Sequence, residues 1–141
     1  MDTLLKTNTV SGSCKCGAVS YSVESDIRQV VNCHCNTCRK MNGSAFSSYA
    51  VVPQKYFSLS GQENVAEFQI AEGMLKHCCK KCGTPVYNLN SRYPKYCMIY
   101  LGSLENSASL VPSRNIYCES MLDWVEHIAA MENYDQDFVG K

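Results

Sequence analysis

Ten cysteines stand in a chain of 141 residues, and their spacing is the first sign of chemistry. Eight of them fall into three short groups: Cys14/Cys16, Cys33/Cys35/Cys38 and Cys78/Cys79/Cys82. Cys97 and Cys118 stand alone. Nothing in the sequence signals export, and in a reducing compartment clustered cysteines bind metals more often than they form disulfides. The spacing therefore predicts metal binding.

The first and third groups predict one closed site. The two-residue spacer between Cys79 and Cys82 lets both thiolates reach a single metal ion. A strand places residues i and i+2 on one face, so Cys14 and Cys16 would project together. Two such pairs complete a tetrahedral site. We expect a structural zinc held by these four cysteines, with Cys78 beside it as a possible replacement for Cys79.

The second group, Cys33, Cys35 and Cys38, is then left as a set of three. Strand periodicity brings Cys33 and Cys35 together and turns His34 away, against a closed site that includes the histidine. Three protein ligands with the fourth position open are typical of a catalytic zinc. Three thiolates also give the site a net negative charge. A substrate thiolate in the fourth position is then more natural than a strongly acidified water.

Two other interpretations of this triplet stay open. It could be a second structural zinc that a distant residue closes, such as Cys97 or Cys118. It could instead be a redox cluster in which Cys35 and Cys38 form a transient disulfide. Ligand number is the only feature of the sequence that favours the open catalytic site.

A basic pair, Arg39 and Lys40, directly follows the triplet. Most such pairs are simply solvated. A functional interpretation is recognition of a substrate carboxylate, because an arginine can bind a carboxylate through two parallel hydrogen bonds. We keep both residues as candidate substrate contacts.

Composition limits the class of protein. The length suits one domain covering 1–141, with a core at about 10–130. The formal net charge is zero, which gives no broad electrostatic footprint for nucleic acid. No apolar run approaches a membrane span, and the apolar part of MDTLLKTNTV is too short for a secretory signal. We expect a cytoplasmic protein with neither nucleic acid nor membrane as a partner; nothing specifies its oligomeric state.

Short strands must position these cysteines. Alternation over 9–23 predicts a strand or hairpin with turns at Gly12 and Gly17. A short helical turn after Cys38 should end near Gly43. Composition favours further strands at 30–31, 45–52, 57–59, 65–70 and 96–101.

The end of the chain has a different periodicity. Apolar residues recur there at helical spacing: Met121, Leu122, Val125, Ile128 and Ala129. This predicts a C-terminal helix with Ser120 as its N-cap and Trp124 as its anchor in the core. The expected fold is mainly β, with short antiparallel strands stapled by zinc and one late helix.

Four motifs together resemble a known family. They are GSCKCGAVSY at 12–21, NCHCNTCRKMNGSAF at 32–46, CKKCGTPVY at 79–87 and IYLGSLEN at 99–106. In this order they resemble the glutathione-dependent formaldehyde-activating enzymes, a family that includes the centromere protein V group. The resemblance covers about 12–124. Two positions depart from it: Cys78 stands where the family often has an aromatic residue, and Asn115 where many members carry histidine.

The resemblance implies a β-tent fold, similar to that of methionine sulfoxide reductase B, and two zinc ions. Structural zinc would be held by Cys14, Cys16, Cys79 and Cys82, and catalytic zinc by Cys33, Cys35 and Cys38. The implied activity is condensation of formaldehyde with glutathione to S-(hydroxymethyl)glutathione, a carbon–sulfur lyase reaction. Two alternatives stay open: a zinc-binding interaction module without catalysis, and a thiol redox protein.

Overall fold

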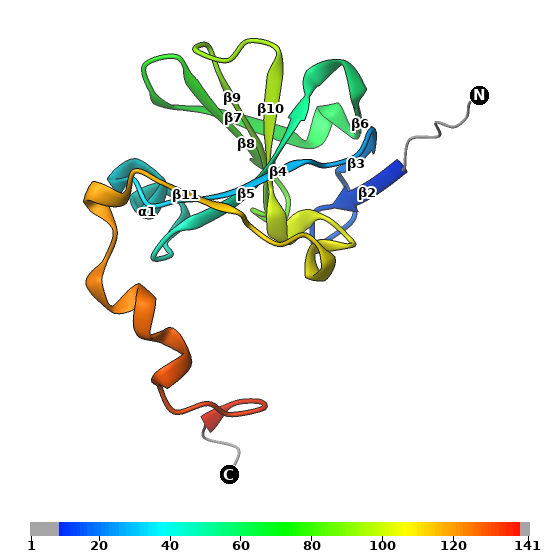
Figure 1. Cartoon of the computed structure of the whole chain (residues 1–141). Coiled ribbons are helices and arrows are strands. Elements are labelled where there is room, and N and C mark those ends of the chain that lie inside the picture. Colours follow the sequence, from blue (N-terminus) through cyan, green and yellow to red (C-terminus); the bar gives the residue numbers. More distant parts are fainter. Residues whose placement is uncertain (1–8, 139–141) are drawn as a thin grey trace, which may run out of the picture.

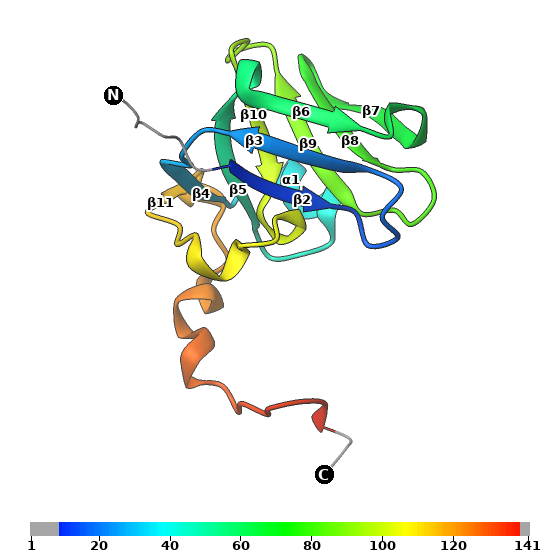
Figure 2. The same cartoon turned by 90° about the vertical axis from the view of Figure 1, so that its right-hand side faces the viewer.

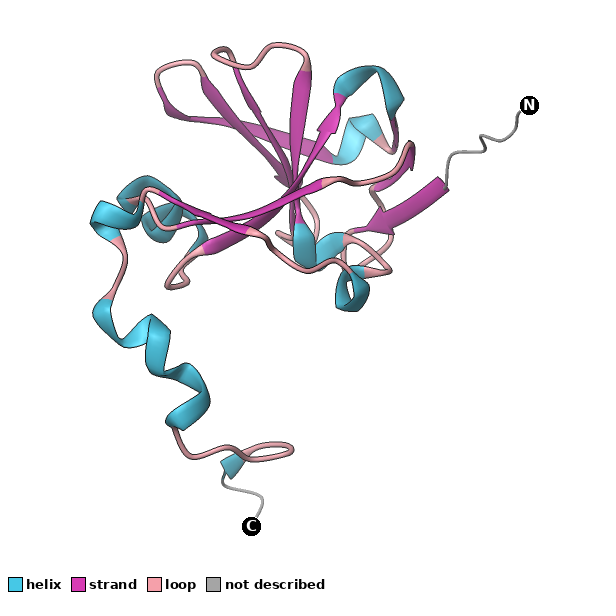
Figure 3. Ribbon diagram, in the orientation of Figure 1, coloured by secondary structure: helices cyan, strands magenta, loops and turns pink. Residues whose placement is uncertain are grey.

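The computed structural model describes residues 9–138, and ten strands in that range form two sheets (Figure 1). The strands are β2 (Thr9–Ser13), β3 (Ser20–Glu24), β4 (Gln29–Cys33), β5 (Ser47–Pro53), β6 (Phe57–Ser60), β7 (Val65–Ala71), β8 (Met74–Cys79), β9 (Pro85–Asn90), β10 (Tyr96–Tyr100) and β11 (Arg114–Ile116). Helical segments are short, as Figure 3 shows. They are α1 (Asn36–Asn42) and the 3-10 turns η1 (Gln54–Tyr56), η2 (Gln62–Asn64), η3 (Leu101–Ser103), η4 (Ser107–Ser109), η5 (Cys118–Ser120) and η6 (Asp123–Ala130). The mainly β class is confirmed.

The larger sheet has the order β11-β4-β5-β10-β9-β8-β7, and the smaller sheet the order β2-β3-β6. All neighbours pair antiparallel except β11, which runs parallel to β4. Figure 2 shows the small sheet lying across β8, β9 and β10. Side chains of both sheets, among them Val23, Val52, Val86 and Ile99, form the main core. The two sheets therefore bury their apolar faces against each other.

The first hairpin follows the prediction in one glycine and departs from it in the other. Gly17 lies in the β2–β3 turn with φ 84°, a conformation that glycine adopts without steric cost. Gly12 is not in a turn but inside β2, opposite Tyr21. A Cβ there would collide with the Tyr21 ring and the Ser103 backbone oxygen. Close packing explains this glycine.

The predicted C-terminal helix is present only as a run of 3-10 turns, η6, with a kink at His127. Its N-cap is Leu122 and not Ser120, so that prediction was wrong. Trp124 is 46% exposed and does not anchor the core. Figures 1 and 2 show the segment leading away from both sheets. An α-helix depends on packing of its apolar face for most of its stability, and this segment has no sheet beneath it.

Within residues 9–138, no helix is both long enough and apolar enough to cross a lipid bilayer.

Candidate functional site

The four cysteines expected to share one metal lie together, although they come from two distant hairpins. Cys14 and Cys16 belong to the β2–β3 connection, and Cys79 and Cys82 to the β8–β9 connection. All four Sγ atoms lie within 4.8 Å of one another. Cys16 Sγ is 3.7 Å from Cys14 Sγ and 3.8 Å from Cys79 Sγ. Tetrahedral zinc with bonds of about 2.3 Å would set its sulfurs about 3.8 Å apart, so the cluster fits zinc.

The β8–β9 turn is shaped to present its two thiols. Gly83 adopts φ 82°, and its amide donates to the Cys79 carbonyl at 2.8 Å, which closes the turn. The Lys81 amide donates to Cys79 Sγ at 3.3 Å. Hydrogen bonding to Thr84 lowers the pKa of Cys82 to about 5. These contacts favour the thiolate form, which is the form that binds metal.

The second cluster comes from one continuous stretch of chain. Cys33 ends β4, Cys35 is the N-cap of α1, and Cys38 lies in the first turn of α1. Their three Sγ atoms also lie within 4.8 Å of one another, and Cys38 Sγ is 3.6 Å from Cys33 Sγ. The Cys38 amide donates to Cys35 Sγ at 3.2 Å. This cluster could therefore hold a metal ion of the same size as the first.

His34 lies outside this cluster, as the strand periodicity predicts. Its side chain is 1% exposed and its ring packs against Phe46, with ring centroids 5.0 Å apart. Its Nε2 donates to Asn115 Oδ1 at 3.0 Å, because an amide oxygen can only accept. The same Oδ1 accepts from Asn32 Nδ2 at 3.3 Å. Asn115 thus holds the His34 ring in its position against Phe46.

Among residues 9–138, no fourth cysteine, histidine or carboxylate joins Cys33, Cys35 and Cys38. Cys97 is fully buried in the core between the two sheets. Cys118 is exposed, and its thiol donates to the Asn115 carbonyl at 3.4 Å. Neither of the two distant cysteines closes the triplet in this structure.

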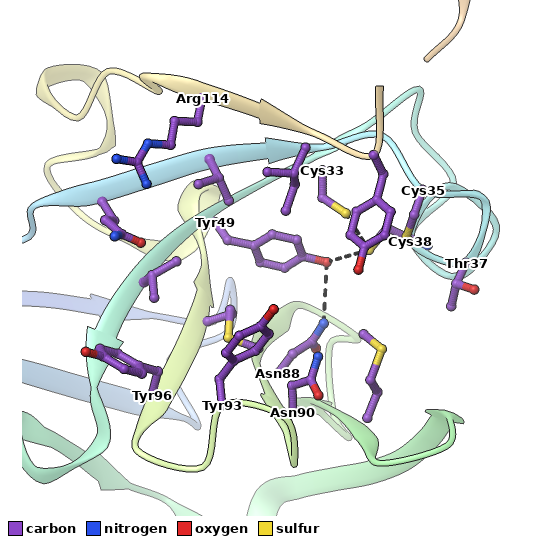
Figure 4. Close-up of a pocket in the computed structure, with 17 residues that line it drawn as sticks. Cys33, Cys35, Thr37, Cys38, Tyr49, Asn88, Asn90, Tyr93, Tyr96 and Arg114 are labelled. Carbon is purple, nitrogen blue, oxygen red and sulfur yellow. Dashed lines mark hydrogen bonds between the residues drawn. The ribbon is translucent and has the colours of Figure 1, made fainter. Parts of the chain in front are cut away.

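The triplet opens instead onto a cavity of about 580 Å³ (Figure 4). Side chains from β4, β5, β9, β10 and β11 line it, together with α1. Figure 4 shows Cys35 and Cys38 at one end and Arg114 at the other. The cavity is large enough for a small organic ligand, whose sites commonly occupy 300–1,000 Å³. A metal in this cluster would therefore face a ligand-sized space.

Tyr49 connects the cysteines to the floor of this cavity. Its hydroxyl lies 3.1 Å from Cys38 Sγ and accepts from Asn88 Nδ2 at 3.4 Å, as the dashed lines in Figure 4 show. Burial raises the pKa of Tyr49, so the hydroxyl keeps its proton and can donate to the sulfur. The sequence analysis did not identify this contact, because Tyr49 and Cys38 lie on different elements.

A buried lysine, Lys76, places its ammonium group at the C-terminal end of α1. Lys76 is 8% exposed, and its Nζ donates to the Met41 carbonyl at 2.9 Å and to Asn42 Oδ1 at 2.7 Å. Burial lowers the pKa of Lys76, and the negative charge of the Cys78 and Cys38 thiolates opposes that shift. The lysine thus caps the carbonyl end of the helix that carries Cys38.

The basic pair after the triplet lies outside the lining of the cavity. Arg39 donates to the backbone oxygens of His34, Ala45 and Ser120 and to the Asn36 side chain. These contacts tie α1 to the chain that follows β11. Lys40 is exposed. Neither residue lines the cavity, and their role as substrate contacts stays a prediction.

Comparison with known proteins gives the family of the chain. The sequence model of the glutathione-dependent formaldehyde-activating enzymes matches residues 9–120, and the chain belongs to that family. A Halomonas elongata protein, provisionally named a glutathione-dependent formaldehyde-activating enzyme, is 27% identical over 138 residues, covering 91% of this chain and 84% of that protein. A Schizosaccharomyces pombe protein named as an uncharacterized lyase is 30% identical over 76 residues, covering 54% of each.

The fold also has a counterpart among solved structures. A crystal structure of a Rhodobacter sphaeroides protein superposes with a TM-score of 0.60 at 23% identity. The match covers 72% of this chain and 97% of that one. At this identity the likeness concerns the fold alone.

Proposed function

We propose that this protein is a zinc-dependent carbon–sulfur lyase that forms S-(hydroxymethyl)glutathione from formaldehyde and glutathione. The observation that carries the proposal is a cluster of three thiols, without a fourth protein ligand in residues 9–138, at the end of a ligand-sized cavity. Three ligands with an open position are typical of catalytic zinc. Membership of the formaldehyde-activating family supports the choice of substrates.

The two clusters would then have different roles. Cys14, Cys16, Cys79 and Cys82 would hold a structural zinc that joins the β2–β3 and β8–β9 hairpins. Cys33, Cys35 and Cys38 would hold the second zinc, which supplies a Lewis-acidic position with affinity for a substrate thiolate. The fit of both clusters to zinc–sulfur geometry supports this assignment.

The chain's own residues would bind and orient the reactants. The cavity holds glutathione with its sulfur toward the triplet, and Tyr49 fixes Cys38 Sγ through its hydroxyl. The glutathione sulfur then attacks the carbonyl carbon of formaldehyde. A carbon–sulfur bond forms, the π bond of the carbonyl breaks, and the proton lost by the thiol is gained by the oxygen. Holding both reactants in one cavity lowers the entropy cost of the step.

The finer fold and location belong to the same proposal. Two facing sheets joined by a four-cysteine cluster support the β-tent assignment for a single domain covering 1–141, with its core at about 10–130. Two clusters that need reduced thiols support a cytoplasmic location.

Metal analysis together with a rate measurement tests the proposal. We expect two zinc ions per chain, one of which exchanges or loosens when glutathione is added. We also expect the zinc-loaded protein to accelerate adduct formation, followed by NMR exchange spectroscopy of formaldehyde and glutathione. One zinc that glutathione does not affect, with no acceleration, would contradict it. Four protein ligands at the second zinc would favour an interaction module, and a reversible Cys35–Cys38 disulfide with loss of that zinc would favour a redox protein.

A further inference from the structure

Arg114 is the only lysine, arginine, aspartate or glutamate among the described residues that line the cavity. Within residues 9–138 its guanidinium has no hydrogen-bond or ion-pair partner. Arg39 differs sharply, because its guanidinium already donates to four oxygens of the protein. An arginine carries five donors that normally find acceptors. Arg114 therefore presents unused donors to a cavity that contains no opposing carboxylate.

The sheet sets how far this arginine lies from the cysteines. Strand β11 runs parallel to β4, with Ile116 beside Cys33 and Arg114 beside Val31. Two residues of a parallel strand span about 6.6 Å, and residues i and i+2 share a face. The backbone of Arg114 therefore lies about 7 Å along the strand from the level of Cys33. Figure 4 shows its side chain among the residues that line the cavity.

The wall of the cavity is suited to a short peptide. Gln29 and Asn90 offer neutral amide groups, and Tyr93 and Tyr96 offer aromatic surface. A tripeptide in extended form spans about 10 Å, so a thiol held at the triplet would place a carboxylate one residue away within reach of an arginine side chain. The positive end and the sulfur end thus lie at opposite ends of one cavity that a short peptide could occupy.

We propose that Arg114 binds a carboxylate of the thiol substrate and selects thiols that carry a carboxylate about one peptide unit from the sulfur. This inference rests on the proposed function, because that function places the substrate thiol at the three-cysteine cluster. The guanidinium fork matches a carboxylate in shape and forms two parallel hydrogen bonds with it. Recognition of the carboxylate would hold the substrate in register without taking part in bond formation.

Equilibrium binding without formaldehyde tests Arg114 separately from turnover. Calorimetry would measure glutathione binding to the zinc-loaded parent, Arg114→Met, Arg114→Lys and Arg28→Met. Arg28 is a matched control, because it is exposed, immediately precedes β4 and does not line the cavity. Loss of a charge-assisted contact predicts about 10–100-fold weaker binding for Arg114→Met. The glutathione affinity of Arg114→Lys should lie between those of the parent and Arg114→Met, and the affinity of Arg28→Met should equal that of the parent.

The ligand offers a second, independent perturbation. Glutathione diethyl ester keeps the thiol and removes both carboxylates. The parent should bind the ester about 10–100-fold more weakly than the acid, whereas Arg114→Met should hardly distinguish the two. In steady-state kinetics the same variant should raise KM for glutathione and leave kcat nearly unchanged, since the contact is the same in the ground state and the transition state.

Several outcomes would overturn the inference. Equal glutathione affinity in the parent and Arg114→Met would do so, as would an equal loss for acid and ester in that variant. If Arg114→Met changes the zinc content or the melting temperature, the test uses the parent protein only. The inference is then overturned if the parent binds the diethyl ester as tightly as glutathione. Arg114-dependent binding of glutathione without turnover of formaldehyde would instead support the inference and contradict the proposed function.

Discussion

Replacement of Cys35 by serine separates two roles of this residue, namely metal binding in the three-cysteine cluster and capping of α1. Its sulfur belongs to the three-cysteine cluster, and it also caps α1 by accepting from the Cys38 amide at 3.2 Å. Serine is among the preferred N-cap residues, so its oxygen can replace the cap. Serine does not replace a thiolate as a zinc ligand. The substitution should therefore remove metal binding at the three-cysteine cluster and preserve α1.

The expected difference in stability between the serine and alanine variants follows from the N-cap contact. Loss of an N-cap contact costs about 1 kcal/mol, so metal-free Cys35→Ala should be about 1 kcal/mol less stable than Cys35→Ser. In a chain of this size that difference corresponds to about 3 °C in melting temperature. Cys35 is only half-buried, which keeps any cavity contribution small. Both variants should lose one zinc per chain and lose adduct formation to background.

The assay is thermal denaturation of metal-free and zinc-loaded protein, with zinc stoichiometry and the rate of adduct formation measured on the same samples. The reasoning fails if Cys35→Ser unfolds, because the triplet would then be a structural site. It also fails if Cys35→Ser keeps full activity, because the reaction would not depend on the open cluster. Equal stability of the serine and alanine variants would contradict the assigned cap.

Three further predictions concern the surroundings of the two clusters. Cys79→Ser should remove the link between the two hairpins, lower the melting temperature far more than Cys35→Ser, and make the melting temperature less sensitive to chelators; a small change would contradict a structural zinc. Tyr49→Phe leaves Cys38 Sγ without its hydroxyl partner, so zinc affinity or activity should fall about 10–100-fold in a chelator competition or rate assay, and unchanged values would refute the contact. Burial raises the pKa of Cys97 from 9.0 to about 12. A raised pKa stabilises the fold below pH 9, and that contribution is lost as the pH rises toward 12, by at most about 1.4 kcal/mol per pH unit. Urea unfolding at pH 8 and 10 should show a smaller alkaline loss for Cys97→Ala than for the parent.

The cysteine clusters were predictable because short sequence spacings and the ligand number of zinc limit the possible sets. Cys33 ends β4 and Cys35 keeps an extended backbone, so these two side chains face the same way, whereas Cys14 and Cys16 meet in the β2–β3 connection. The same rule turned His34 away from its neighbours, and the structure places it against Phe46. The count of four ligands then joined Cys14 and Cys16 to Cys79 and Cys82, a pairing that local geometry alone does not give.

The far end of the cavity was not predictable in this way. Strand β11 is three residues long and pairs with β4, so residues 83 positions apart in the chain come into contact. A segment of three exposed residues carries no periodicity that could reveal such a pairing. Arg114 was missed for that reason. The apolar spacing near Trp124 misled in the opposite sense, because periodicity indicates a helical face but does not supply a surface on which to pack it.

The difference between the two clusters follows from what each segment meets. Both begin as two cysteines separated by one residue. The first pair is followed by a turn at Gly17 and meets a second hairpin that brings two more thiols, which closes the site. The second pair continues directly into α1, so its third sulfur comes from the same segment. The strand that then reaches the cluster, β11, places Ile116 beside Cys33 and offers no ligand.

The next cysteine in the chain, Cys118, lies just after β11 at the start of η5. Tyr117 adopts φ 58°, the only positive φ at a non-glycine residue in the described chain, at a cost of about 1–2 kcal/mol. The residue after it, Cys118, is exposed and bonded to the Asn115 carbonyl. Meanwhile Tyr117 itself lines the cavity. The left-handed conformation thus lies at a residue of the cavity wall, and strain of this kind gathers at functional sites. Neither Ile116 nor Cys118 supplies a fourth ligand from this segment, and that supports the proposal that the three-cysteine cluster keeps an open side.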